Sequence, residues 1–250
     1  MTWLEALAVL GAGMAAGTIN TIVGSGTLIT FPTLLALGYP PVVANVSNTV
    51  GLVPGSVTGA IGYRRELAGQ LARLLRLGVA SLAGGVTGAV LLLTLPASAF
   101  DAIVPVLIGI GCLLVVLQPW VSSKISRPHD PPPHGSIWVW LGVFLVGIYG
   151  GYFGAAQGVL LMAIMGIGLD ESVQRLNASK NVLAGLVNGV AAGMFIVLAD
   201  VDWLVALLIA GGSVAGGVVG AHVGRRLAPW VLRDVIVVVG AVAVWRLLFC

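Results

Sequence analysis

The sequence predicts an all-α, polytopic membrane protein of two inverted repeats, each with a broken-helix region and three transmembrane helices. Three observations lead to this fold class: 8% of the 250 residues are charged, 58% are hydrophobic, and the two halves of the chain resemble each other. A soluble domain usually has about a quarter of its residues charged. A surface solvated by lipid needs fewer charges. The net charge of +3 is therefore no sign of nucleic-acid binding.

The first apolar region, residues 3–37, is too long for one crossing of about 20 residues. Polar and glycine residues interrupt it between Asn20 and Thr27, which predicts a helix, a break and a shorter helix. The two helices are expected to form a hairpin or a re-entrant pair. Glu5 lies where a signal peptide would have a basic residue, so we expect the first segment to stay in the mature protein.

Three full crossings are predicted next, over residues 41–62, 72–94 and 99–119. The proline-rich stretch 121–136 is then expected to be an extended cytoplasmic linker that separates a first repeat, 1–120, from a second, 137–250. Its histidines, His129 and His134, fit solvated surface residues better than metal ligands.

The second half repeats this order. Region 137–168 is again too long for one crossing and is interrupted at Gly154, Gln157 and Gly158, which predicts a second broken helix. Three more full crossings are predicted over residues 174–198, 203–224 and 230–249.

Charge placement predicts the orientation of these segments, because Lys and Arg favour cytoplasmic loops. If both interrupted regions return to the side from which they came, ten of the twelve basic residues are cytoplasmic. Only Lys180, inside a span, and Arg246, near the end of the last one, are exceptions. The acidic turns at Asp101 and at Asp200–Asp202 then lie outside, as do both termini.

The two halves match at a constant offset of 132 residues. The motif SLAGGVTGA (81–89) corresponds to SVAGGVVGA (213–221), and polar residues such as Asn45 and Asn177 also correspond. We interpret the glycines of this motif as helix-packing positions. Each half has an odd number of full crossings, so the second must be inverted. Inverted repeats recur in secondary transporters, whose binding sites lie between the repeats.

Two kinds of polar cluster are candidate substrate-binding sites. At a helix break, free N–H groups and the helix dipole favour an anion, although close helix packing is an alternative reason for the glycines. The candidates at the breaks are Asn20, Ser25, Gly26, Thr27, Gln157 and Gly158. The candidates in NVSNT (45–49) and NASKN (177–181) are Asn45, Ser47, Asn48, Asn177, Ser179, Lys180 and Asn181.

Lys180 is the strongest single candidate for attracting an anion, because a lysine inside a span costs roughly 3 kcal/mol or more. The alternative is a lysine that reaches the cytoplasmic headgroups. No Asp or Glu lies deep in a predicted span, which disfavours ion coupling through a buried carboxylate. Cys112 and Cys250 match no metal or disulfide pattern. We expect no metal, no cofactor and no catalytic residues.

The motifs at the two breaks resemble those of the TauE/SafE family of sulfite and organosulfonate exporters. The first copy is GTINTIVGSGTLITFPTLLALGYPPVVANVSNTVGLVPGSVTGAIGY (17–63), and the second begins GGYFGAAQGVLLMAIMGIG (150–168). The resemblance covers essentially the whole chain. It implies a permease of the bacterial cytoplasmic membrane for small sulfur-containing anions. The second copy has AAQG where a more glycine-rich run is typical.

The favoured hypothesis is therefore an anion transporter that works by alternating access between inverted repeats. Two alternatives stay open: a permease for another small anion such as a carboxylate, and a membrane scaffold subunit that transports nothing. An enzyme is disfavoured because no catalytic motif is present. The expected partners are a small anionic substrate and the lipid bilayer, with no nucleic acid. The sequence leaves a homo-oligomer open.

Overall fold

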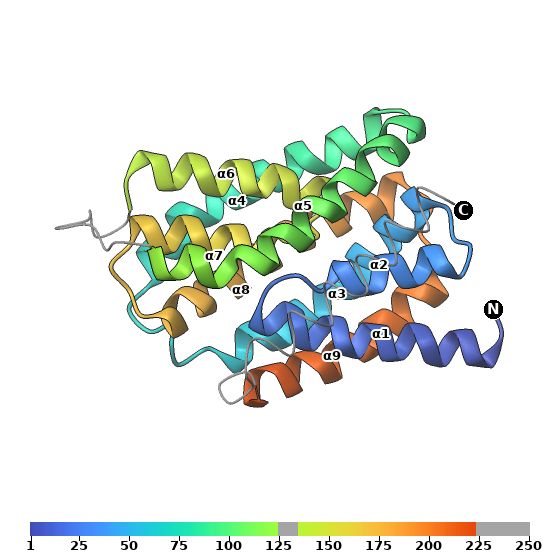
Figure 1. The fold of residues 1–250 in the computed structure, drawn as a ribbon, viewed down its shortest axis with the longest axis horizontal. Coiled ribbons are helices and arrows are strands. Elements are labelled where there is room, and N and C mark those ends of the chain that lie inside the picture. Colours follow the sequence, from blue (N-terminus) through green and yellow to red (C-terminus); the bar gives the residue numbers. More distant parts are fainter. Residues whose placement is uncertain (125–134, 224–250) are drawn as a thin grey trace.

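The computed structural model describes residues 1–124 and 135–223, which form nine α-helices and no strand (Figure 1). The helices lie side by side along the long axis of the bundle. Their bounds are α1 Trp3–Ile22, α2 Thr27–Ala36, α3 Pro41–Gly62, α4 Leu71–Thr94, α5 Ala97–Lys124, α6 Ile137–Tyr152, α7 Gln157–Gly168, α8 Val173–Leu198 and α9 Trp203–Val223.

Local signals in the sequence set several helix starts. Helix α1 begins with a capping box, in which the Glu5 N–H donates to Thr2 Oγ1 and the Thr2 N–H donates to Glu5 Oε2. Helix α3 begins with Pro41, whose missing N–H would have no helical partner at that position. Helix α8 is capped by Ser172, which accepts from the Arg175 N–H.

Both predicted helix breaks are present. Helix α1 ends at Ile22, and Gly24 then adopts a φ of 88°, while α6 ends at Tyr152 and Gly154 adopts a φ of 76°. Glycine is suited to this left-handed conformation because it has no Cβ. The short helices α2 and α7 each run back toward the end from which the preceding helix came (Figure 1).

Five of the six predicted full crossings are described, and they are helices α3, α4, α5, α8 and α9. Helices α1, α4, α5, α8 and α9 are both long and apolar enough to cross a membrane. Helix α5 continues to Lys124, so the first four residues of the expected extended linker are helical instead. The predicted crossing 230–249 and the linker histidines lie outside the described residues.

The two repeats have the same helix order and run in opposite directions (Figure 1). Helices α3 and α8 begin 132 residues apart, as do α4 and α9. The expectation of one constant offset is wrong for the first helix, because α1 and α6 end 130 residues apart, at Ile22 and Tyr152. The second copy therefore has two additional residues between its first helix and its first full crossing.

Each repeat packs its first helix against the second full crossing of the other repeat. Helix α1 lies on α9, and α6 lies on α4, while α3 and α8 contact each other at the centre. Glycines allow the close approach: a Cβ on Gly88 would lie 2.1 Å from Ile148 O, and one on Gly216 would lie 2.0 Å from Met14 O. These contacts support the packing interpretation of the repeated glycine motif.

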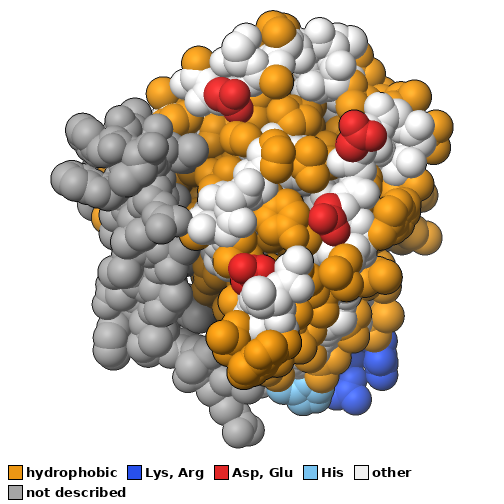
Figure 2. Space-filling model, turned by 90° about the vertical axis from the view of Figure 1, so that its right-hand side faces the viewer, with side chains coloured by type: hydrophobic (Ala, Val, Ile, Leu, Met, Phe, Trp, Pro, Cys, Tyr) orange, Lys and Arg blue, Asp and Glu red, His pale blue; other side chains and the backbone are white. Residues whose placement is uncertain are grey.

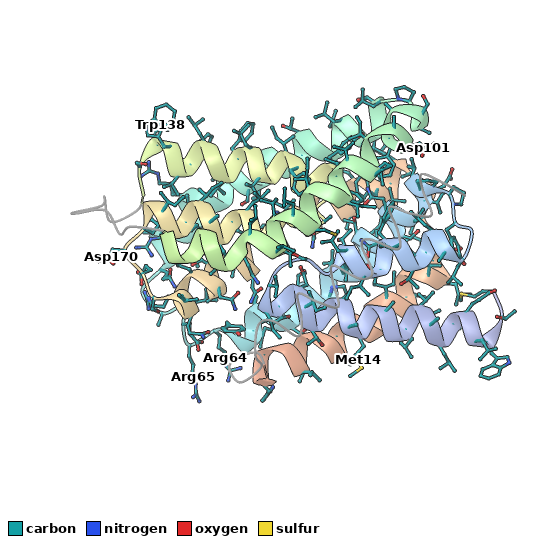
Figure 3. The ribbon with its side chains drawn as sticks, viewed as in Figure 1. Met14, Arg64, Arg65, Asp101, Trp138 and Asp170 are labelled. Atoms are coloured by element: carbon teal, nitrogen blue, oxygen red, sulfur yellow. The ribbon has the colours of Figure 1, made fainter. Side chains whose placement is uncertain are left out.

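Two charged segments lie at opposite ends of the bundle. Arg64 and Arg65 lie at one end and Asp101 at the other (Figure 3). The end that carries Asp101 is shown in Figure 2, where acidic side chains are spread over the face and basic ones appear at its lower margin. Arg64 and Arg65, which are predicted to lie on the opposite side of the membrane from Asp101, therefore lie at the opposite end of the molecule.

A network of ion pairs joins the two repeats at the basic end. Arg73 Nη1 donates to Glu171 Oε1 at 2.8 Å, and Arg175 Nε donates to Glu171 Oε2 at 2.6 Å. Arg175 also donates to the backbone oxygen of Ala68 at 3.0 Å, in the loop between α3 and α4. Partial burial alone would raise the pKa of Glu171, but the two guanidinium groups outweigh it and lower that pKa.

Replacing Glu171 should change how stability depends on pH. A carboxyl whose pKa is lowered by folding adds stability above its unfolded pKa, and this stability is lost as pH falls through the folded value. We expect the thermal midpoint of the purified wild type to fall in this acidic window, and Glu171→Gln to show a smaller fall. Asp101→Asn, at the opposite end, is the control. Equal acid sensitivity of Glu171→Gln and wild type would contradict the assignment.

Gly88→Val should destabilise the bundle, because the added side chain would collide with the backbone of α6. We expect a loss of about 1–3 kcal/mol or more, the usual effect of overpacking. Ala83→Val is the matched control, since Ala83 is exposed on the same helix and should change stability by about 0.5 kcal/mol or less. The measurement is the heat-resistant folded fraction on size exclusion, and equal losses in both variants would disprove the contact.

Candidate functional site

The two helix breaks meet in the middle of the bundle (Figure 1). The Gly158 N–H donates to Gly24 O at 3.0 Å, and a Cβ on either glycine would lie 2.4 Å from the Cα of the other. The C-terminal ends of α1 and α6 and the N-terminal ends of α2 and α7 thus gather at one place. We call this place the helix junction; it comprises residues 23–26 and 153–158.

Polar side chains of the junction have atoms with no hydrogen-bond partner among the described residues. Ser25 is fully buried and its Oγ is unpaired, and Gln157 is 3% exposed with Nε2 unpaired. The side chain of Gln157 packs against Gly150, where a Cβ would lie 2.4 Å from Gln157 Cδ. Because an unpaired buried donor is costly, these two donors are suited to bind a ligand.

Asn45 and Asn177 occupy equivalent positions in α3 and α8 and act on the opposite repeat. Asn45 Nδ2 donates to Tyr152 O, at the end of α6, at 3.0 Å. Asn177 Nδ2 donates to Thr21 O, near the end of α1, at 3.3 Å. The Oδ1 atom of each asparagine is buried and unpaired. Each repeat therefore caps the broken helix of the other and has an acceptor left over.

Lys180 extends into the bundle and reaches the end of α1. It is fully buried, and its Nζ donates to Asn20 O at 3.0 Å and to Thr21 O at 3.2 Å. Asn181 Nδ2 also donates to Thr21 O, at 3.3 Å. The ammonium is thus bound inside the protein and does not extend to the headgroups.

The equivalent of Lys180 in the first repeat is Asn48, which has a different role. Its Nδ2 donates to Thr27 Oγ1 at 3.2 Å, and its Oδ1 accepts from Thr30 Oγ1. These bonds fix the start of α2 on α3. Gly26 brings α2 against α1, because a Cβ there would lie 2.5 Å from Ala16 O.

Ser47 and Ser179 bind loops and not the junction. Ser47 Oγ accepts from the Asp202 N–H at 2.9 Å, in the loop before α9. Ser179 Oγ donates to Gln70 Oε1 at 2.9 Å, just before α4. These two contacts are equivalent by the repeat, so each serine fixes the entry to a long helix of the other half.

Sequence reasoning missed one polar pair at the interface of the repeats. Asn188 Nδ2 approaches Ser56 Oγ at 3.5 Å, and Asn20 Nδ2 donates to the same oxygen at 3.4 Å. Ser56 and Asn188 are 132 residues apart, at equivalent positions of α3 and α8. Polar residues at matching positions in two apolar spans were the signal that could have identified this pair.

The junction has a positive charge. A helix end carries about half an elementary charge, positive at the N-terminus and negative at the C-terminus. Two ends of each kind meet here, so their contributions offset each other. Lys180 is the only Lys, Arg, Asp or Glu among the buried residues that the structure describes, and its protonated form adds a positive charge. The sign of the site therefore depends on this residue, which makes it suited to a small anion.

Comparison with known proteins identifies the family of the chain. The family model described as sulfite exporter TauE/SafE matches residues 9–247. The chain is 29% identical over 244 residues to the probable membrane transporter protein ORF9 of Sinorhizobium sp, covering 95% of this chain and 90% of that protein. It is 27% identical over 244 residues to the probable membrane transporter protein YfcA of Escherichia coli strain K12, covering 94% and 87%.

A probable membrane transporter protein of Haemophilus influenzae is 23% identical over 239 residues, covering 94% of this chain and 91% of that protein. No solved structure matches the chain. The family match spans both repeats and the helix junction between them. Transport across a membrane is a non-enzymatic role. From its fold and this match, the chain is a multi-pass membrane transporter that belongs to the TauE/SafE family.

Proposed function

We propose that this transporter moves small sulfur-containing anions, such as sulfite or organosulfonates, and that the helix junction is their binding site. One observation carries the proposal: the buried Lys180 ammonium lies near the place where the ends of the four helices α1, α2, α6 and α7 meet. The offsetting helix ends leave a net positive charge of about one unit. The sulfur class of substrate is supported by the description of the matching family.

The proposed ligands of the anion are hydrogen-bond donors. Backbone N–H groups at the starts of α2 and α7, such as those of Leu28 and Gly158, already donate to backbone oxygens. The unpaired donors are therefore the side-chain groups Ser25 Oγ, on the first repeat, and Gln157 Nε2, on the second. Lys180 contributes through its charge, since two of its three N–H groups already bind α1. Three oxygens of a sulfonate or sulfite group could accept from donors on both repeats at once.

Alternating access fits the way in which the repeats contact each other. The equivalent contacts Ser47–Asp202 and Ser179–Gln70 lie on the two halves, so the inverted repeats can exchange roles. The Glu171 network is present at the basic end alone among the described residues, and it would have to open for access from that side. The proposed direction is export.

The proposed location is the cytoplasmic membrane of a bacterium, with the basic end facing the cytoplasm. The segregation of Arg64 and Arg65 from Asp101 supports this orientation (Figure 3). In this orientation the N-terminus lies outside. The C-terminus is proposed to lie outside as well, from the charge pattern of the sequence.

Removing one donor of the junction should reduce transport without loss of folded protein. We expect Ser25→Ala and Gln157→Leu each to slow sulfite flux into proteoliposomes by about tenfold, because a hydrogen bond to a charged group contributes about 1.5–3 kcal/mol. Ser81→Ala is the matched control: Ser81 is also fully buried with an unpaired Oγ, but it lies against α6. Its flux should equal that of the wild type.

Normal flux in Ser25→Ala and Gln157→Leu would show that the site lies elsewhere. Competition decides the substrate class: inhibition by acetate as strong as by a sulfonate would favour a general anion permease. If the purified protein alone carries no anion at all, while a partner subunit restores flux, it is a scaffold.

Cysteine labelling tests the orientation. In a background with Cys112 and Cys250 replaced by alanine, a membrane-impermeant maleimide added to cells should label Asp101→Cys and leave Arg65→Cys unlabelled. Both should react after the membrane is permeabilised. The reverse pattern in intact cells would place the basic end outside.

A further inference from the structure

We propose that the end of α1 is a cation-binding site of the sodium type, and that the Lys180 ammonium occupies it in place of a free ion. Transport by this chain would then need no sodium. The inference goes beyond the proposed anion site, because it concerns the oxygens on the other side of Lys180.

The oxygens around the ammonium are those that bind sodium in other settings. Backbone carbonyls at the C-terminal end of a broken helix coordinate Na⁺ in secondary transporters of inverted repeats. Here Lys180 Nζ lies 3.0 Å from Asn20 O and 3.2 Å from Thr21 O, two carbonyls of the last turn of α1. These carbonyls also carry the negative end of the helix dipole.

Asn177 supplies a further buried oxygen near these two carbonyls. Asn177 donates to Thr21 O through Nδ2, so its amide lies beside the carbonyl that the ammonium binds. Its Oδ1 is unpaired, and the residue is 6% exposed. No hydrogen bond joins this oxygen to the Lys180 ammonium, so it stays available to a free cation in Lys180→Ala.

The side chain of Lys180 reaches these oxygens by passing Gly158, whose lack of a side chain leaves a slot for it. A Cβ on Gly158 would lie 3.0 Å from Lys180 Cδ. The lysine stem therefore passes the helix junction before its ammonium reaches α1. Shortening the side chain at position 180 would vacate both the stem and the ammonium while leaving the oxygens in place.

The first repeat shows what the site is like without a tethered charge. Asn48 is equivalent to Lys180, and it bonds Thr27 and Thr30 on α2 instead of the end of α6. The end of α6 is capped by the neutral amide of Asn45. A cation is therefore built into one repeat and not the other.

Thermal unfolding in matched salts tests the proposal. Purified Lys180→Ala is compared in NaCl and in choline chloride at equal ionic strength, without substrate. We expect sodium to raise its midpoint by about 5–10 °C at a concentration roughly a hundredfold above its Kd. Wild type should not respond, since its ammonium fills the site. Lys180→Met should not respond either, because its side chain fills the slot, and it should be less stable than wild type in both salts.

Several outcomes would overturn the proposal. One is an equal midpoint of Lys180→Ala in both salts, and another is failure of this variant to fold in either salt, because sodium then cannot replace the ammonium. Lys180→Met as stable as wild type would show that no cation is needed. A sodium response of equal size in wild type or Lys180→Met would show that the effect arises elsewhere.

These measurements use no transported substrate and the same chloride concentration in both salts, so they are independent of the proposed function. If Lys180→Ala gains sodium-dependent stability but no variant transports sulfite, the cation site stands and the anion proposal fails. If wild-type flux is normal but requires sodium, the anion proposal stands, and the proposal that Lys180 replaces a sodium ion is wrong.

Discussion

The constraint on which the rest of the structure depends is that broken helices end inside an apolar bundle. A helix end has four unpaired carbonyls or N–H groups, and lipid offers them no partner. In this chain the partner comes from the opposite repeat: Asn45 caps α6, while Asn177 and Lys180 cap α1. The breaks therefore exist only where the repeats are interlocked, and the polar centre is a consequence of that interlocking.

The helix junction is both a close backbone contact and the place where the charge of Lys180 acts. Gly24 and Gly158 let two backbones touch, which brings the positive ends of α2 and α7 together. Lys180 then serves both sides of the contact: its bonds satisfy α1, and its charge sets the sign of the junction. A neutral residue at position 180 would leave the carbonyls of α1 without their strongest partner and the junction without net charge.

Much of the fold could be predicted from the sequence because membrane spans obey simple length and polarity rules. The breaks at Gly24 and Gly154, the starts of α3 and α8 and the inverted repeat follow from those rules. The two extra residues in the second copy could not be predicted, because the sequences of α1 and α6 have little in common. Their equivalence is visible only from their packing, α1 on α9 and α6 on α4. The hydrogen-bond partners of the polar side chains could not be predicted from the sequence either. Ser47 and Ser179 looked like members of a central site, yet they bond loops far along the chain, and only the packing of α3 and α8 decides this.

The exchange of first helices between the repeats also affects biosynthesis. Helix α1 leaves the ribosome first, but it packs on α9, about two hundred residues later in the chain. Until α9 is inserted, the glycine face of α1 has no helix to pack against. Its C-terminal carbonyls also lack the hydrogen bonds from Lys180 until α8 has been made. The N-terminal half must therefore stay in the membrane as an unfinished assembly, and the protein becomes compact only when most of its second half has been made.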